Sequence, residues 1–122
     1  MLIVEDQVAV RRLTSTILEI LGYRVLQASG GPGAIALAEQ YPNTIHLLLT
    51  DAIMPFMDGR ALADKLRAAR PEIAVLYMSG YTDERIGQSG VLDHKSAYLP
   101  KPFTPDALAA KVREALADKN SL

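Results

Sequence analysis

The side chains best suited to chemistry in this sequence lie close behind short apolar runs. Glu5 and Asp6 follow the first run, Asp51 follows the third, and Lys101 follows the last. A short apolar run is typical of a strand buried in a parallel sheet. A charge that follows such a strand lies at the carboxyl edge of the sheet, where open α/β folds bind their ligands. Three carboxylates and one ammonium there indicate a site for a hard metal ion and an anionic phosphoryl group.

The three carboxylates should converge, because the first and third strands are neighbours in the doubly wound order 2-1-3-4-5. Like charges held together raise one another's pKa unless a cation neutralises them. Mg²⁺ suits a set of carboxylates and waters, and Mn²⁺ would fit as well. The alternative is that Glu5, Asp6 and Asp51 only cap the helices that follow them.

Lys101 and Ser79 complete the candidate site. Lys101 lies between Pro100 and Pro102, which have no amide donor, so we expect a defined turn rather than an ordinary interior strand. Its ammonium can pair with Asp51 and with an oxygen of a phosphoryl group attached there. Ser79 ends the fourth apolar run and can donate a hydrogen bond to the same group, although an ordinary turn serine is the alternative.

Short apolar runs alternate with segments of helical periodicity. The first helix should bury an apolar stripe and end at Gly22 in a left-handed cap; that stripe comprises Val8, Leu13, Ile17, Ile20 and Leu21. Thr104 and Pro105 open the last helix as N-cap and first helical residue. The predicted strands cover residues 1–4, 24–28, 46–50, 73–78 and 97–99, and the other helices lie at about 34–41, 59–70 and 83–93. The helix at 83–93 is weak, because Gly87 and Gly90 interrupt it.

This alternation predicts an α/β fold with a five-stranded, flavodoxin-like parallel sheet. Right-handed crossovers place helices on both of its faces, and residues 1–122 form a single domain. The net charge of −1 gives no basic field for nucleic acid or anionic membranes. No apolar segment reaches the roughly 20 residues that span a bilayer. The absence of cysteine excludes disulfides and thiolate chemistry, and we expect a cytoplasmic location.

Four segments of the chain resemble the receiver domain of two-component response regulators, in order and in spacing. The similarity covers essentially the whole chain. The stretch around the third strand, together with the Lys-Pro pair, is the most specific part. The four segments are Val4-Glu5-Asp6-Gln7, Leu49-Thr50-Asp51-Ala52-Ile53-Met54-Pro55-Phe56-Met57-Asp58-Gly59, Met78-Ser79-Gly80-Tyr81 and Leu99-Pro100-Lys101-Pro102-Phe103.

The resemblance implies that Asp51 accepts a phosphoryl group from a phosphohistidine on a histidine kinase or phosphotransfer domain. Asp6 and Asp51 would bind Mg²⁺ together with the backbone carbonyl of Ile53. Glu5 stands where many family members carry Asp and would bind the ion directly or through water. These roles suit phosphoryl transfer, which depends on positioning of the reacting groups and on electrostatic stabilisation of the transferring group.

The resemblance also implies how the signal is read out. Lys101 would neutralise the phosphoryl charge, Ser79 would hydrogen-bond to it, and the Lys101–Pro102 bond would be cis. Tyr98 matches the aromatic switch residue of the family, although it also reads as a partly buried edge aromatic. A downstream protein would bind through the face formed by residues 83–118, with no direct contact to nucleic acid or membrane.

Several readings of the parent protein and of the function stay open. The segments around Tyr81 and Lys101 are similar to receivers of hybrid sensor histidine kinases; a free single-domain regulator is the alternative. The chain could also be a degenerate receiver that only docks. An aspartate-nucleophile phosphatase would need an acid where Ile53 stands. A nucleotide-binding domain is disfavoured, because residues 30–33 lack the lysine and the spacing of a phosphate-binding loop. The domain itself would be a switch rather than an enzyme, limited to its own phosphorylation and dephosphorylation.

Overall fold

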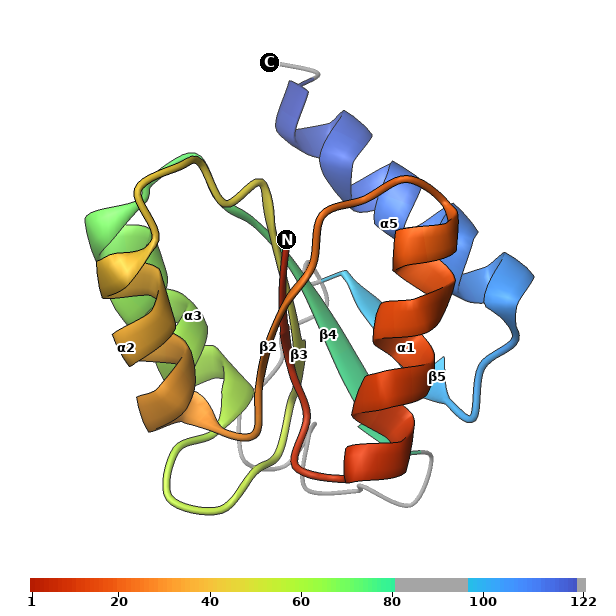
Figure 1. Cartoon of the computed structure of the whole chain (residues 1–122), viewed down its shortest axis with the longest axis horizontal. Coiled ribbons are helices and arrows are strands. Elements are labelled where there is room, and N and C mark those ends of the chain that lie inside the picture. Colours follow the sequence, from red (N-terminus) through yellow and green to blue (C-terminus); the bar gives the residue numbers. More distant parts are fainter. Residues whose placement is uncertain (81–96, 121–122) are drawn as a thin grey trace.

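Five parallel strands form one sheet with the strand order β2-β1-β3-β4-β5 (Figure 1). The computed structural model describes residues 1–80 and 97–120. The order confirms the predicted doubly wound α/β topology, in which β1 and β3 lie side by side at the centre. The strands are β1 Leu2–Val4, β2 Leu26–Ala28, β3 Leu47–Asp51, β4 Ala74–Gly80 and β5 Tyr98–Lys101.

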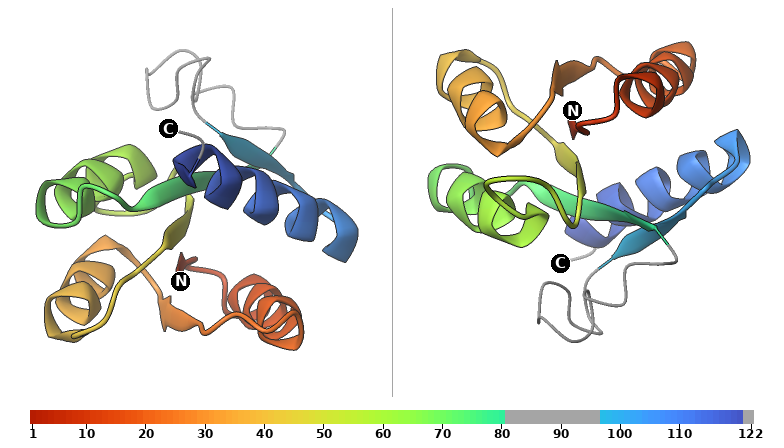
Figure 2. Two further views of the ribbon diagram at one scale, coloured as in Figure 1. Left: turned by 90° about the horizontal axis from the view of Figure 1, so that it is seen from above. Right: turned by 90° about the horizontal axis from the view of Figure 1, so that it is seen from below.

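Helices cover both faces of the sheet, as predicted. Within the described residues they are α1 Val8–Ile20, α2 Gly31–Gln40, α3 Gly59–Ala69 and α5 Pro105–Asn120. Helices α2 and α3 lie on one face and α1 and α5 on the other (Figures 1 and 2). The weak helix expected over 83–93 falls outside the described residues. No described helix has the length and apolar character needed to cross a bilayer.

Each face of the sheet has its own apolar core. Alternate residues of β3 point to opposite faces, so Leu48 packs in the cluster beneath α2 and α3. Leu47 and Leu49 pack in the cluster beneath α1 and α5. All five residues of β3 are buried, as expected for the central strand of a sheet covered on both sides. This burial holds the end of β3, and therefore Asp51, in a rigid position.

The inward face of α1 differs from the prediction. The helix forms where expected, but Val8, Leu13 and Ile20 are exposed. Its buried residues are Thr14, Ser15 and Leu18. The Thr14 hydroxyl donates to the carbonyl of Val10 at 2.7 Å, so this polar side chain is satisfied within the helix. Two small hydroxyl side chains therefore take part of the inward face of α1, beside Leu18.

The predicted cap at the end of α1 is confirmed. Gly22 has a φ of +98°, and its amide donates to the Glu19 carbonyl at 3.0 Å. The amide of Tyr23 donates to the Leu18 carbonyl, also at 3.0 Å. These two bonds form a Schellman motif, which favours glycine at the left-handed position.

The start of α5 is also as predicted. The Thr104 hydroxyl accepts a hydrogen bond from the amide of Ala107 at 3.1 Å, and Pro105 is the first helical residue. The preceding Lys101–Pro102 peptide bond is cis, as the family resemblance implied.

Two strands extend further than the sequence indicated. β4 continues to Gly80, so Ser79 lies within a strand and the turn-serine interpretation is wrong. β5 runs on through Pro100 to Lys101, whereas the prolines predicted a turn. The reason is that β5 is an edge strand, where a missing amide donor leaves no gap in the ladder. Elsewhere β2 begins at Leu26 rather than at residue 24, and α2 begins at Gly31 rather than near residue 34.

Candidate functional site

The carboxyl ends of β1 and β3 bring three acidic side chains together. The two strands are paired in parallel, with Val4 beside Thr50, so Glu5 and Asp51 leave the sheet at the same edge. Glu5, Asp6 and Asp51 each offer a carboxylate oxygen within 4.8 Å of the others. Glu5 and Asp51 are buried, and Asp6 is exposed. The predicted convergence of the carboxylates is therefore present.

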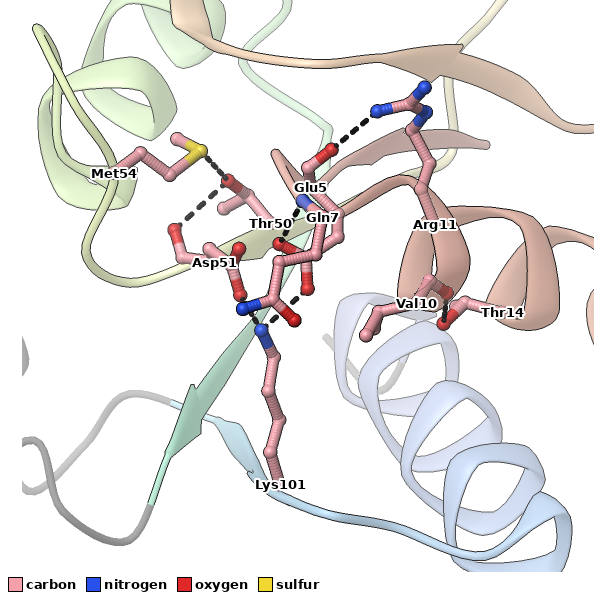
Figure 3. A network of polar contacts seen from close by, with 9 residues as sticks. All are labelled: Glu5, Gln7, Val10, Arg11, Thr14, Thr50, Asp51, Met54 and Lys101. Carbon is pink, nitrogen blue, oxygen red and sulfur yellow. Dashed lines mark hydrogen bonds and ion pairs between the residues drawn. The ribbon is translucent and has the colours of Figure 1, made fainter.

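The ammonium of Lys101 lies between two of these carboxylates (Figure 3). Its Nζ is 2.5 Å from Oε1 of Glu5 and forms a second ion pair with Oδ1 of Asp51. β5 carries the lysine to this position by pairing with β4, with Lys101 beside Gly80. The side chain is only 22% exposed, so the charge points into the acidic site rather than into bulk solvent.

Burial and mutual proximity shift the titration of the buried groups. Burial is the largest influence on Asp51 and, with the neighbouring Glu5, raises its pKa to about 8 against the opposing effect of Lys101. Burial also acts to raise the pKa of Glu5, but hydrogen bonds from Asp51 and Lys101 outweigh it and hold that pKa below its ordinary value. For Lys101, burial is outweighed by the two carboxylates, and its pKa is raised. Such strongly perturbed groups in one cluster are typical of functional sites.

The backbone around Glu5 is held by the first turns of α1. Nη1 of Arg11 donates to the carbonyl of Glu5 at 2.9 Å, and the amide of Gln7 donates to Oε2 of Glu5 at 3.4 Å (Figure 3). The N-cap of α1 is Gln7, which makes no side-chain capping bond. Asp58 rather than Asp51 caps α3, since its Oδ1 accepts from the amide of Ala61 at 2.8 Å. The helix-capping alternative for the acidic residues is therefore wrong.

The loop after Asp51 is closed tightly at its base. The amide of Gly59 donates to the carbonyl of Ala52 at 2.8 Å. A Cβ on residue 59 would lie 2.2 Å from the carbonyl oxygen of Asp51, far inside van der Waals contact. The close approach of α3 to the end of β3 therefore requires glycine at this position.

The remaining predicted residues lie around the same edge. Ser79 is buried one position beyond Met78, the neighbour of Asp51 on β4. Tyr98 is 47% exposed beside Tyr77 on the edge of the sheet. Ile53 is half-buried and packs on the cluster beneath α2 and α3.

Sequence reasoning missed Arg11 and the steric role of Gly59. Arg11 acts on a backbone carbonyl, and no sequence pattern marks such a contact. Gly59 stood in the quoted motif, but only the distance to Asp51 reveals why the position must be small. In both cases the contact depends on how α1 and α3 meet the sheet.

The donor set fits a small divalent cation. Carboxylate oxygens are the ligands that Mg²⁺ prefers. A cation would favour the charged form of Asp51, whose pKa is raised by burial first and by the neighbouring Glu5 second. The exposed Asp6 leaves one side of the cluster open to solvent, as Mg²⁺ requires because it usually keeps several waters. The arrangement thus combines a cation site, a buried carboxylate and a fixed ammonium.

Comparisons with known proteins agree with this geometry. The family model of the response regulator receiver domain matches residues 1–113. The chain is 36% identical over 115 residues to the sensor kinase CckA of Brucella abortus, covering 94% of this chain and 12% of that protein. It is 35% identical over 122 residues to the probable transcriptional regulator ycf27 of Porphyra purpurea, covering 97% and 48% of the two chains. The chain thus spans half or less of these relatives.

Solved structures show the same fold. The receiver domain of the hybrid histidine kinase CckA superposes with a TM-score of 0.77 at 34% identity, covering 94% of this chain and 96% of that one. A CheY-like response regulator receiver domain protein from Methanospirillum hungatei gives a TM-score of 0.80 at 30% identity, covering 98% and 94%.

Proposed function

The chain belongs to the response regulator receiver domain family, and we propose that it is a phosphoacceptor switch in which Asp51 is the phosphorylated residue. The observation that carries this proposal is the ion pairing of Lys101 with both Asp51 and Glu5 inside an acidic cluster. A buried carboxylate beside a fixed ammonium and a cation site has what phosphoryl transfer needs, namely positioning and charge stabilisation.

In the proposed reaction an oxygen of Asp51 attacks the phosphorus of a phosphohistidine on a kinase or phosphotransfer domain. An O–P bond forms as the N–P bond breaks, and the electron pair of that bond stays on the imidazole nitrogen. Asp6, Asp51 and the carbonyl of Ile53 would hold Mg²⁺ or Mn²⁺, with Glu5 binding directly or through water. The ion supplies neutralisation of the charge on the transferring oxygens.

Lys101 and Ser79 would interact with the phosphoryl group on Asp51. Phosphorylation adds about 1.5–2 negative charges at Asp51, so the ammonium would turn from the carboxylates to the phosphoryl oxygens. Ser79 would donate its hydroxyl to the same group. Tyr98 would then rotate inward from its half-exposed position. The rotation would change the output face expected over residues 83–118, of which residues 83–96 lie outside the described part of the chain, and with it the binding of a downstream protein.

The parent protein is best described as a hybrid sensor histidine kinase. Support comes from the identity to the CckA sensor kinase and from the fit to the CckA receiver structure. A free single-domain regulator is the alternative, and reading the gene on both sides of this segment distinguishes the two. In either case residues 1–122 would act as one cytoplasmic receiver domain, without a separate enzymatic reaction and without direct contact to nucleic acid or membrane.

The proposed acceptor chemistry can be tested with a small phosphodonor. Incubation with acetyl phosphate and Mg²⁺ should add one phosphoryl group per chain, measured by intact-protein mass spectrometry. Chelation of the divalent ion should prevent the addition, because the charge on the transferring group is then not neutralised. Equal labelling with and without the ion would contradict the role assigned to the acidic cluster.

Replacing Lys101 by Ala should uncouple phosphorylation from the conformational change. Divalent-ion binding should stay within about threefold of the wild type, because the carboxylates remain. The amide chemical-shift changes that phosphorylation causes in β5 and α5 should disappear, since no ammonium follows the new charge. Lys111→Ala is the matched control, because Lys111 forms a surface ion pair with Glu114, and such a pair contributes little to stability. Shift changes that survive in Lys101→Ala would refute the proposed role of the lysine.

A further inference from the structure

Phe56 combines two unfavourable features in the loop that follows Asp51. Its side chain is 101% exposed, so the whole ring faces water. Its φ of 69° lies in the left-handed region, where residues other than glycine and asparagine are uncommon. A large apolar residue kept in this state indicates a role outside the stability of the isolated chain.

The backbone at Phe56 forms a tight turn. The amide of Met57 donates to the carbonyl of Pro55 at 2.8 Å, which closes a three-residue γ-turn with Phe56 at its centre. A γ-turn with a positive φ at its central residue is rare and strained. The turn points the ring away from the loop.

Both sides of this turn are anchored to the core. Met54 is buried and Met57 packs against the cluster beneath α2 and α3. Met57 also lies over Gly31, where an added Cβ would be 2.7 Å from its sulfur. Gly59 then closes the loop on Ala52. The exposed ring therefore stands on a fixed support, and little conformational entropy is lost when a partner covers it.

The loop stands at the rim of the acceptor site. It leaves β3 at Asp51 and returns to α3 at the same edge of the sheet where α1 begins (Figure 1). The side chain of Asp51 is only 6% exposed, so a macromolecular donor must press its histidine into the site and cover the rim. On the α1 side of the rim, Val8 also exposes its apolar side chain.

We propose that Phe56 is a docking residue for the protein that carries the phosphohistidine. Its ring enters an apolar pocket on the donor while the donor histidine reaches Asp51, and Val8 provides a second apolar contact across the site. This inference rests on the proposed function of Asp51. The occupant is a phosphodonor protein because Phe56 lies in the loop that directly follows Asp51, at the edge of the sheet that such a donor has to cover.

The test compares a small donor with a protein donor. Phe56→Asn removes the ring and suits a positive φ, whereas Phe56→Leu keeps an apolar side chain on the same backbone. The protein donor is the autophosphorylated histidine kinase of the source genome that transfers fastest to the wild-type chain in a phosphotransfer profile. Phe56→Asn should lose about 10- to 100-fold in transfer rate from this kinase, the size expected for a buried aromatic anchor.

Labelling by acetyl phosphate should be unchanged in Phe56→Asn, and its thermal midpoint should rise because the turn is relaxed. Phe56→Leu should keep its rate of transfer from the kinase within about threefold of the wild type.

The inference would be overturned if Phe56→Asn and the wild type accepted phosphoryl groups from the kinase at equal rates. It would also be overturned if no kinase labelled the wild type. If the wild type self-associates and Phe56→Asn abolishes this while transfer from the kinase is unchanged, the ring belongs instead to a contact between two copies of this chain. Failure of acetyl phosphate to label the wild type would be a failure of the proposed function itself.

Discussion

Asp51→Asn should abolish phosphorylation by acetyl phosphate in the presence of Mg²⁺. An amide oxygen is a far weaker nucleophile than a carboxylate, and it brings no charge to a metal ion. We expect incorporation to fall at least about 100-fold, which in intact-mass spectra means no visible phosphorylated species. Glu5 and Asp6 remain in the variant, so the experiment also shows whether a neighbouring carboxylate can substitute. Undiminished labelling would move the acceptor to another residue.

The same variant should be folded and more stable than the wild type at high pH without divalent ions. The pKa of Asp51 in the folded protein is raised to about 8 from its ordinary value of 3.8. The stability associated with the protonated carboxyl is therefore complete below about pH 4 and is lost as the pH rises towards 8. Asparagine does not titrate, so the difference in unfolding free energy between variant and wild type should grow from pH 5 to pH 8. Chemical denaturation in EDTA measures it, and a constant difference would contradict the perturbed pKa.

Gly59→Ala should both destabilise the protein and impair phosphorylation. The new Cβ would lie 2.2 Å from the carbonyl oxygen of Asp51 and 3.1 Å from the Cα of Ala52. Both are backbone atoms in a buried segment, so relief requires the end of β3 to move. We expect a loss of about 2–3 kcal/mol in unfolding free energy, within the range for overpacked sites. Movement of the backbone would displace the carboxylate of Asp51 from its position for attack. Acetyl phosphate labelling of the folded fraction should therefore fall at least about tenfold.

Gly33→Ala is the matched control for this substitution. Gly33 lies in the first turn of α2, and its nearest contact for an added Cβ is 3.9 Å away at Ala28. Alanine should there raise stability by about 0.5–1 kcal/mol, because it suits a helix better than glycine. Labelling should not change. Equal effects of the two substitutions would show that the close approach of α3 to Asp51 is not the cause.

The strand order and the meeting of the acidic residues were predictable from the sequence for a physical reason. β3 is buried on both faces, so its first three residues are apolar, and the polar pair Thr50 and Asp51 marks the edge of the sheet where the strand ends. Parallel strands place their carboxyl ends together, which brings Glu5 and Asp51 to one edge however far apart they are in the chain. Lys101 reaches the same edge because it ends β5, which is parallel to β4, and there it pairs with Glu5 and Asp51.

The inward face of α1 was not predictable from hydrophobicity. A pattern of apolar residues assumes that the larger apolar side chains pack inward, yet α1 buries Thr14 and Ser15 and exposes Leu13 and Ile20. A hydroxyl can be buried at little cost when it bonds to a carbonyl of its own helix, as Thr14 does with Val10. Composition alone does not reveal such a bond.

The interpretation of β5 failed because it applied a rule for interior strands. Proline interrupts a ladder only where its missing amide would face a neighbour. Pro100 lies opposite Ser79 on the last strand of the sheet, so its outer side needs no donor. Whether a strand lies at the edge or in the interior of a sheet depends on the tertiary fold. For β5 the edge position allowed the strand to continue to Lys101, which the local sequence did not indicate.

The role of Asp51 as the acceptor is tested most directly by locating the phosphorylated residue in the wild-type chain. After incubation with acetyl phosphate and Mg²⁺, borohydride reduction converts an aspartyl phosphate into homoserine, which peptide mass spectrometry locates. If Asp51 is the acceptor, homoserine should appear at position 51 and at no other acidic residue. Reduction at Glu5, at Asp6 or elsewhere, or a phosphoryl group that resists borohydride, would contradict this role.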